Sequence, residues 1–152
     1  MERRLKIDFV SDVTCPWCAI GLANLERAID RLQGQVEVEL RFQPFELNPD
    51  IPPEGEALAD YAARKYGASA EELGQRQRLV RQRAAAAGLQ FPERTRVWNT
   101  FDAHRLLHWA GIEGRQRELK HALLDAYHAR GENLGAADVV LSAAAAVGLD
   151  AP

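Results

Sequence analysis

Apolar and polar positions alternate every second residue in two stretches near the start of the chain. Leucine, isoleucine and phenylalanine alternate with charged residues over 5–11, which predicts a strand. Residues 36–43 show the same two-residue period and predict a second strand. Between them, apolar residues recur at helical spacing from Pro16 until Gly34. The first 43 residues are therefore expected to form a β-α-β unit.

The rest of the chain changes character twice. Four prolines fall within residues 44–53, so this stretch is expected to be an ordered loop or linker. From residue 57 onward, apolar residues recur three and four positions apart, and glycines separate the periodic segments. Helices are expected over residues 57–66, 69–87, 99–110, 114–130 and 136–147. Capping signals open two of them, Ser69 with Glu72 and Asn99 with Asp102.

Composition and charge narrow the classes of function. The chain has 152 residues and is 47% hydrophobic, which suffices for one domain with a core, or a core plus a subdomain. Its formal net charge of -3 gives no reason to expect nucleic acid or a membrane as partner. The N-terminus lacks the apolar core and cleavage site of a signal peptide. We therefore expect a cytoplasmic protein, unless a leader was removed before this numbering starts.

The two cysteines of the chain, Cys15 and Cys18, stand in the segment TCPWC, between the first predicted strand and helix. In a reducing compartment such a pair is more often catalytic or metal-binding than structural. Free N–H groups and the dipole at a helix N-terminus stabilise a thiolate, and a cysteine one turn later can reach it. We predict Cys15 as the nucleophile and Cys18 as the resolving thiol. Pro16 is expected to fix the turn, and Trp17 to be exposed as a substrate-binding surface.

The cysteines and histidines also admit alternative roles. A structural disulfide is one alternative for the cysteines. His104 and His108 lie four residues apart, so a Cys2His2 metal site is another, although the pairs are much farther apart in sequence than in zinc fingers; no metal is expected. His104 is expected on the polar flank of its helix or, in the functional alternative, on a substrate-binding surface. His121 and His128 are expected at the molecular surface.

Longer segments make the likeness to a known family specific. They are FVSDVTCPWCAIGLANLERAI at 9–29, FQPFELNPDIP at 42–52 and NTFDAHRLLHWA at 99–110. On these segments the chain resembles the DsbA family of thiol-disulfide oxidoreductases and, within it, the cytoplasmic FrnE-like branch. The resemblance implies an α/β, thioredoxin-like fold with a large helical insertion. The expected divisions are a β-α-β part over 1–43, a proline-rich linker over 44–56 and a helical subdomain over 57–152.

The same resemblance implies an enzyme that oxidises, reduces or isomerises disulfides in protein or small thiol substrates. Members of the family resume the thioredoxin fold after the inserted helices, with a cis-proline loop, two further strands and a final helix. This chain ends at LDAP, so we expect those parts to be absent from it and the sheet to have a bare edge, which favours a homodimer.

Two other functions are kept as alternatives. One is a glutathione-dependent isomerase or transferase of the kappa or 2-hydroxychromene-2-carboxylate isomerase type. Those enzymes resemble this chain in layout but keep a serine at the nucleophile position, so the two cysteines argue against them. Glutathione would be their co-substrate, and no other cofactor is expected. The second alternative is a truncated, non-catalytic helical module that binds a partner.

Overall fold

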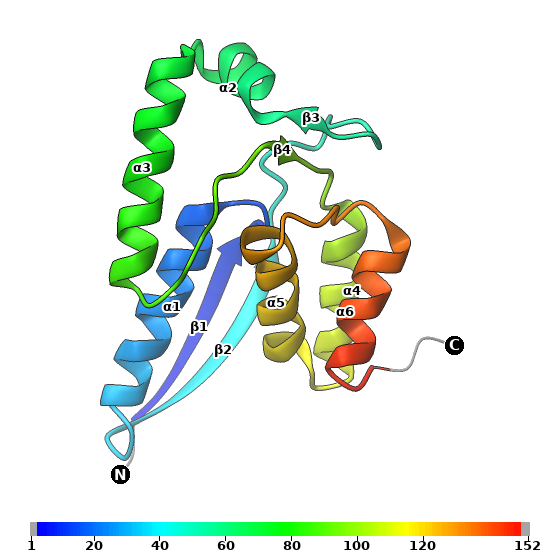
Figure 1. Ribbon diagram of the computed structural model, residues 1–152. Coiled ribbons are helices and arrows are strands. Elements are labelled where there is room, and N and C mark those ends of the chain that lie inside the picture. Colours follow the sequence, from blue (N-terminus) through cyan, green and yellow to red (C-terminus); the bar gives the residue numbers. More distant parts are fainter. Residues whose placement is uncertain (1–2, 150–152) are drawn as a thin grey trace.

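A parallel pair of strands and the helix between them form the first part of the fold. The computed structural model describes residues 3–149 (Figure 1). It contains β1 (Arg3–Ser11), α1 (Pro16–Arg31) and β2 (Val36–Pro44) in this order. Each residue of β1 lies opposite the residue 33 positions later in β2. Parallel strands need a crossover connection, and α1 supplies it. The predicted β-α-β unit is confirmed.

The remaining helices form two groups around these strands. They are α2 (Leu58–Tyr66), α3 (Ala70–Ala86), α4 (Phe101–Ile112), α5 (Gln116–Leu124), the π-helical turn η1 (Asp125–Ala129) and α6 (Ala137–Ala146). Figure 1 shows α1 and α3 on one side of the strands, α4 to α6 on the other, and α2 beyond the carboxyl ends of the strands. In the part of the chain that the structure describes, no helix combines the length and apolar character needed to cross a membrane.

Two very short strands were not predicted. β3 (Glu56–Ala57) and β4 (Arg96–Val97) pair antiparallel. Two residues are too few to show the alternation by which a strand is recognised in sequence. This pairing joins the start of α2 to the segment that returns from α3. The chain segments before α2 and after α3 are therefore held together by this strand pair.

The start and end of α4 differ from the predicted ones. The helix begins at Phe101, whose N–H donates to Asn99 Oδ1 at 2.9 Å, while Asn99 Nδ2 donates to the carbonyl of Ile51 at 3.2 Å. Asn99 thus serves both the helix and the proline-rich loop. Gly111, predicted as the stop, lies inside the helix. The chain turns instead at Gly114, whose φ of 71° is in the left-handed region that glycine adopts readily.

The largest apolar core joins the β-α-β unit to the second helical group. Leu22 of α1 and Phe42 of β2 pack in one buried cluster with Leu107 of α4 and with Leu119 and Leu123 of α5. By contrast, α2 and α3 pack through two small apolar clusters. They consist of Ile51, Leu58, Tyr61 and Val97 around α2, and of Ile20, Ala84 and Ala87 between α1 and α3.

The parallel sheet is narrow. Within residues 3–149 it consists of β1 and β2 alone, so each strand has one unpaired edge, as predicted. Leu5 and Val10 of β1 are 48% and 60% exposed. All peptide bonds of the described residues are trans.

The predicted capping box at the start of α3 is confirmed. Ser69 Oγ accepts the N–H of Glu72 at 3.2 Å, and the Glu72 carboxylate accepts the N–H of Ser69 at 2.8 Å. Two N–H groups that have no partner within the helix are thereby satisfied.

We expect Ser69→Ala to lower the free energy of unfolding by about 1 kcal/mol, the usual effect of losing an N-cap oxygen. Urea unfolding followed by circular dichroism measures it. Ser142→Ala removes a hydroxyl from an exposed position inside α6 and serves as the control. Equal effects of the two substitutions would contradict the role of Ser69.

Candidate active site

The CPWC segment forms the N-terminus of α1, directly after β1. Cys15 is the N-cap residue, with extended backbone angles, and its Sγ accepts the N–H of Cys18 at 3.3 Å. Pro16 occupies the first turn, where its missing N–H leaves no helical hydrogen bond unmade. The first turn contains no acidic residue, so nothing there opposes the positive end of the helix dipole. Both thiols are free.

The two thiols form a hydrogen-bonded pair that favours one negative charge. The hydrogen bond from Cys15 lowers the pKa of Cys18 to about 6, and the same bond, with burial, raises the pKa of Cys15. The pair therefore loses its first proton more readily than an isolated cysteine and its second less readily. The N–H of Cys18 donates to Cys15 Sγ at the N-terminus of α1, which stabilises a negative charge on Cys15, the predicted nucleophile.

Asp12, three residues before Cys15, is a buried carboxylate with 1% exposure. Burial raises the pKa of Asp12, but hydrogen bonds from His104, from the Leu47 N–H and from Thr100 outweigh it and lower the pKa below the usual range. Oδ2 accepts the Leu47 N–H at 2.8 Å, and Oδ1 lies 3.1 Å from His104 Nε2. The ionised Asp12 thus ties the linker and α4 to the loop that carries the thiols.

The expectation that His104 lies on the polar flank of its helix is wrong, whereas its part in substrate binding stays a prediction. Its side chain is 7% exposed and faces Asp12 from the same helix side as the buried Ala103 and Leu107. A carboxylate accepts only, so the Nε2–H of His104 donates. The helix periodicity could not reveal this, because the partner lies 92 positions away in the sequence. Residues 3–149 hold no group of three metal-ligating side chains.

Lys120 of α5 is a second buried charge near the thiols. It is 1% exposed, and its ammonium lies 5.9 Å from the ring centroid of Phe42. Burial lowers the pKa of Lys120 to about 8, opposed by the charges of Asp12, Cys18 and Cys15. In turn, its positive charge contributes to the low pKa of Cys18. Nothing in the periodic pattern of residues 114–130 marks this lysine as buried.

His128 was expected at the surface and is also buried, with 1% exposure. It lies in the π-helical turn η1, and its Nε2–H donates to the carbonyl of Val13 at 2.8 Å, just before the CPWC segment. Its ring stacks on Phe91, with centroids 4.9 Å apart. Burial lowers the pKa of His128 to about 3, so the ring is neutral. His128 supports the backbone that leads into Cys15.

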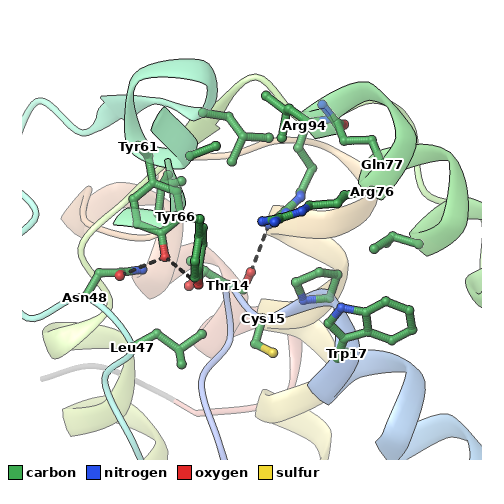
Figure 2. A pocket seen from close by; sticks show the side chains of 16 residues that line it. Thr14, Cys15, Trp17, Leu47, Asn48, Tyr61, Tyr66, Arg76, Gln77 and Arg94 are labelled. Atoms are coloured by element: carbon green, nitrogen blue, oxygen red, sulfur yellow. Dashed lines mark hydrogen bonds between the residues drawn. The ribbon is translucent and has the colours of Figure 1, made fainter. Parts of the chain in front are cut away.

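A cleft opens beside Cys15, between the start of α1 and helices α2 and α3. Its volume is about 220 Å³, and Cys15 and Pro16 line it whereas Cys18 does not. Figure 2 shows Tyr61 and Tyr66 on one side of this cleft and Trp17 on the other. Trp17 is 48% exposed, as predicted. The cleft lies at the carboxyl ends of the parallel strands, the usual place for sites in α/β folds.

Comparison with known proteins agrees with this geometry. Residues 6–152 match the DSBA-like thioredoxin domain. The chain belongs to this family. It is 28% identical over 149 residues to the uncharacterized protein YwbO of Bacillus subtilis. It also matches the crystal structure of the "probable DsbA oxidoreductase SCO1869" from Streptomyces coelicolor, with a TM-score of 0.88 and 31% identity.

These matches span most of this chain but only part of each relative. They cover 95% of the chain and 66% of the Bacillus protein, and 96% of the chain and 64% of the Streptomyces structure. The predicted family and the thioredoxin-like fold with a helical insertion are confirmed. The FrnE-like branch stays a prediction, as does the division at residues 43 and 56.

The buried His128 makes stability depend on pH. Below pH 6.5 the unfolded chain binds a proton at this residue, whereas the folded chain does not until about pH 3, so acid favours unfolding. We expect the free energy of unfolding to fall by about 1.4 kcal/mol per pH unit from this group across that window. In denaturant titrations His128→Gln should show a shallower fall than the wild-type chain, with His108→Gln, at an exposed position, as the control. An unchanged slope in His128→Gln would contradict this assignment.

Lys120 is expected to lower stability while it supports the thiolate. Lys120→Met removes a buried charge, so the free energy of unfolding at pH 7 should rise by about 2 kcal/mol. The pKa of the first thiol titration should rise as well, read from the pH dependence of alkylation by mass spectrometry. Lys6→Met, at an exposed position of β1, should change neither quantity. A thiol pKa unaffected by Lys120→Met would show that the ammonium does not act on the pair.

Proposed function

We propose that this chain performs thiol-disulfide exchange through Cys15 and Cys18. The observation that carries the proposal is the pair of free thiols at the start of α1, where Cys15 Sγ accepts the N–H of Cys18 and only Cys15 lines the cleft. A substrate sulfur entering the cleft meets Cys15 first. Cys18, behind it and one helical turn on, is placed to attack the mixed disulfide that forms.

The reaction has two steps of the same kind. The Cys15 thiolate attacks a sulfur of the substrate disulfide, a Cys15–substrate disulfide forms, and the first substrate thiolate leaves and takes up a proton. The Cys18 thiolate then attacks Cys15 Sγ, which releases the second substrate thiolate and leaves a Cys15–Cys18 disulfide. Two electrons pass from the protein dithiol to the substrate. In the reverse direction, the protein disulfide oxidises a substrate dithiol.

The charges around the pair favour the oxidising direction. Hydrogen bonding by Cys15 and the positive charge of Lys120 stabilise a thiolate, which exists only in the reduced protein. Stabilising the reduced form makes the disulfide form a stronger oxidant. Asp12 has the opposite effect on Cys18 and moderates this tendency.

The two cysteines should give different products when one is replaced. Cys18→Ser keeps Cys15 and removes the resolving thiol, so the mixed disulfide with the substrate should accumulate and be visible as a dithiothreitol-sensitive mass increase. Cys15→Ser should form no such adduct and should reduce insulin disulfides only at the uncatalysed rate. Mass spectrometry of the intact chain and an insulin turbidity assay measure these outcomes.

Three results would contradict the proposal or its roles. Full insulin reduction by Cys15→Ser would exclude Cys15 as the nucleophile. An adduct that forms on Cys18 faster than on Cys15 would reverse the two roles. Glutathione-dependent isomerisation that survives Cys18→Ser would favour the isomerase alternative, because that chemistry does not need a second thiol.

A further inference from the structure

The cleft beside Cys15 is positively charged on a chain whose formal net charge is -3. Sixteen described residues line it; none of them is aspartate or glutamate, and two, Arg76 and Arg94, are arginines. Figure 2 shows both arginines reaching toward the space beside Cys15. This concentration of positive charge is opposite in sign to the chain as a whole.

Arg94 is held in place next to the predicted nucleophile. Its Nη1 donates to the carbonyl of Thr14, the residue before Cys15, at 3.1 Å and to the hydroxyl of Tyr127 at 3.4 Å. Its backbone N–H donates to Gln77 Oε1 at 3.0 Å. A guanidinium has five N–H donors, so Nε and Nη2 are left to bind an anion. The side chain is therefore preorganised beside the reacting sulfur.

Arg76 approaches the cleft from α3. Its guanidinium carbon lies 5.4 Å from the ring centroid of Tyr66. Glu72, one turn earlier on the same helix, is occupied by the capping box and does not pair with it. Among residues 3–149, neither Arg76 nor Arg94 forms an ion pair with a carboxylate. The cleft thus holds two guanidiniums without an acidic partner, and guanidinium is the side-chain group best suited to bind carboxylates.

The rest of the cleft limits the size and character of what it binds. Leucine, valine and tyrosine side chains form much of the wall, among them Leu58, Leu73 and Val80. Its volume of about 220 Å³ is small even beside ordinary small-molecule sites, which begin at roughly 300 Å³. The cleft therefore suits a short aliphatic molecule better than a folded protein surface.

We infer that this cleft binds small disulfides and thiols that carry a carboxylate close to sulfur, with Arg94 and Arg76 as the carboxylate ligands. This inference rests on the proposed exchange at Cys15 and names its substrate class. One sulfur of the small disulfide accepts the attack of Cys15, and the other leaves as a thiolate that takes up a proton. Cys18 then closes the protein disulfide and releases the second carboxylate-bearing thiol.

The test uses disulfides that share one reaction and differ in charge. The reduced chain is mixed with dithiodipropionate, which carries two carboxylates, with the neutral hydroxyethyl disulfide or with the dicationic cystamine, and its oxidation is followed by mass spectrometry. Each rate is divided by the rate of the same disulfide with dithiothreitol, which removes intrinsic reactivity. We expect the normalised rate for dithiodipropionate to exceed that for hydroxyethyl disulfide by about fivefold, and cystamine to be slowest.

Matched variants assign the preference to the cleft. Arg76→Gln should reduce the ratio of the dithiodipropionate rate to the hydroxyethyl disulfide rate about threefold. Arg76→Lys keeps the charge and should retain most of the preference. Arg78→Gln makes the same charge change on the same helix, outside the cleft, and should have no effect. High salt should reduce the preference, because it screens exposed charges.

The outcomes separate this inference from the proposed function. Equal normalised rates for the three disulfides would overturn the inference, while oxidation of Cys15 by hydroxyethyl disulfide would still support exchange. No reaction of Cys15 with any of them would overturn both. If Arg76→Gln slows only an acidic cysteine-peptide disulfide and not dithiodipropionate, the arginines serve a polypeptide, and the small-molecule assignment is wrong.

Discussion

The buried carboxylate of Asp12 is the constraint on which the rest of the site depends. An ionised group removed from water must have hydrogen-bond partners, and Asp12 takes them from Leu47 in the proline-rich loop and from His104 in α4. Its backbone carbonyl also accepts the N–H of Cys15 at 3.3 Å. One residue therefore fixes the linker, the second helical group and the start of α1 relative to each other. The position of the thiols follows from that arrangement.

The charges around the thiols are arranged at the expense of stability. Lys120 is buried beside the pair and held at a pKa near 8, which is unfavourable for folding but supports a thiolate. The negative charge of Asp12 raises the pKa of Cys18, so two buried charges of opposite sign act on this thiol in opposite directions. Such perturbed groups gather where proteins do chemistry, and here they lie under the end of the sheet.

The two helical groups, α2 with α3 and α4 to α6, have different roles in the fold. Helices α4 to α6 share the main core with α1 and β2. From this group, the charge of Lys120 acts on Cys18, and His128 donates to the carbonyl of Val13. Helices α2 and α3 rest on two small clusters and form one wall of the cleft. A wall with few buried contacts opens at a lower free-energy cost than the core. In this cleft, Cys15 is therefore fixed by the main core, whereas the wall formed by α2 and α3 is displaced at a lower free-energy cost.

Local patterns in the sequence determined the β-α-β unit, the helices and the placing of Cys15 at a helix start. Their signals, such as alternation, capping and Pro16, act over a few residues and need no distant partner. The tertiary structure alone decided which polar residues are buried. The sequence pattern placed His104 and His128 on outward faces and gave no sign that Lys120 is buried. The two histidines are buried against Asp12 and Val13, which lie about a hundred positions away in the sequence. The arginines of the cleft meet Cys15 for the same reason: only the return of the chain through β4 brings Arg94 to Thr14.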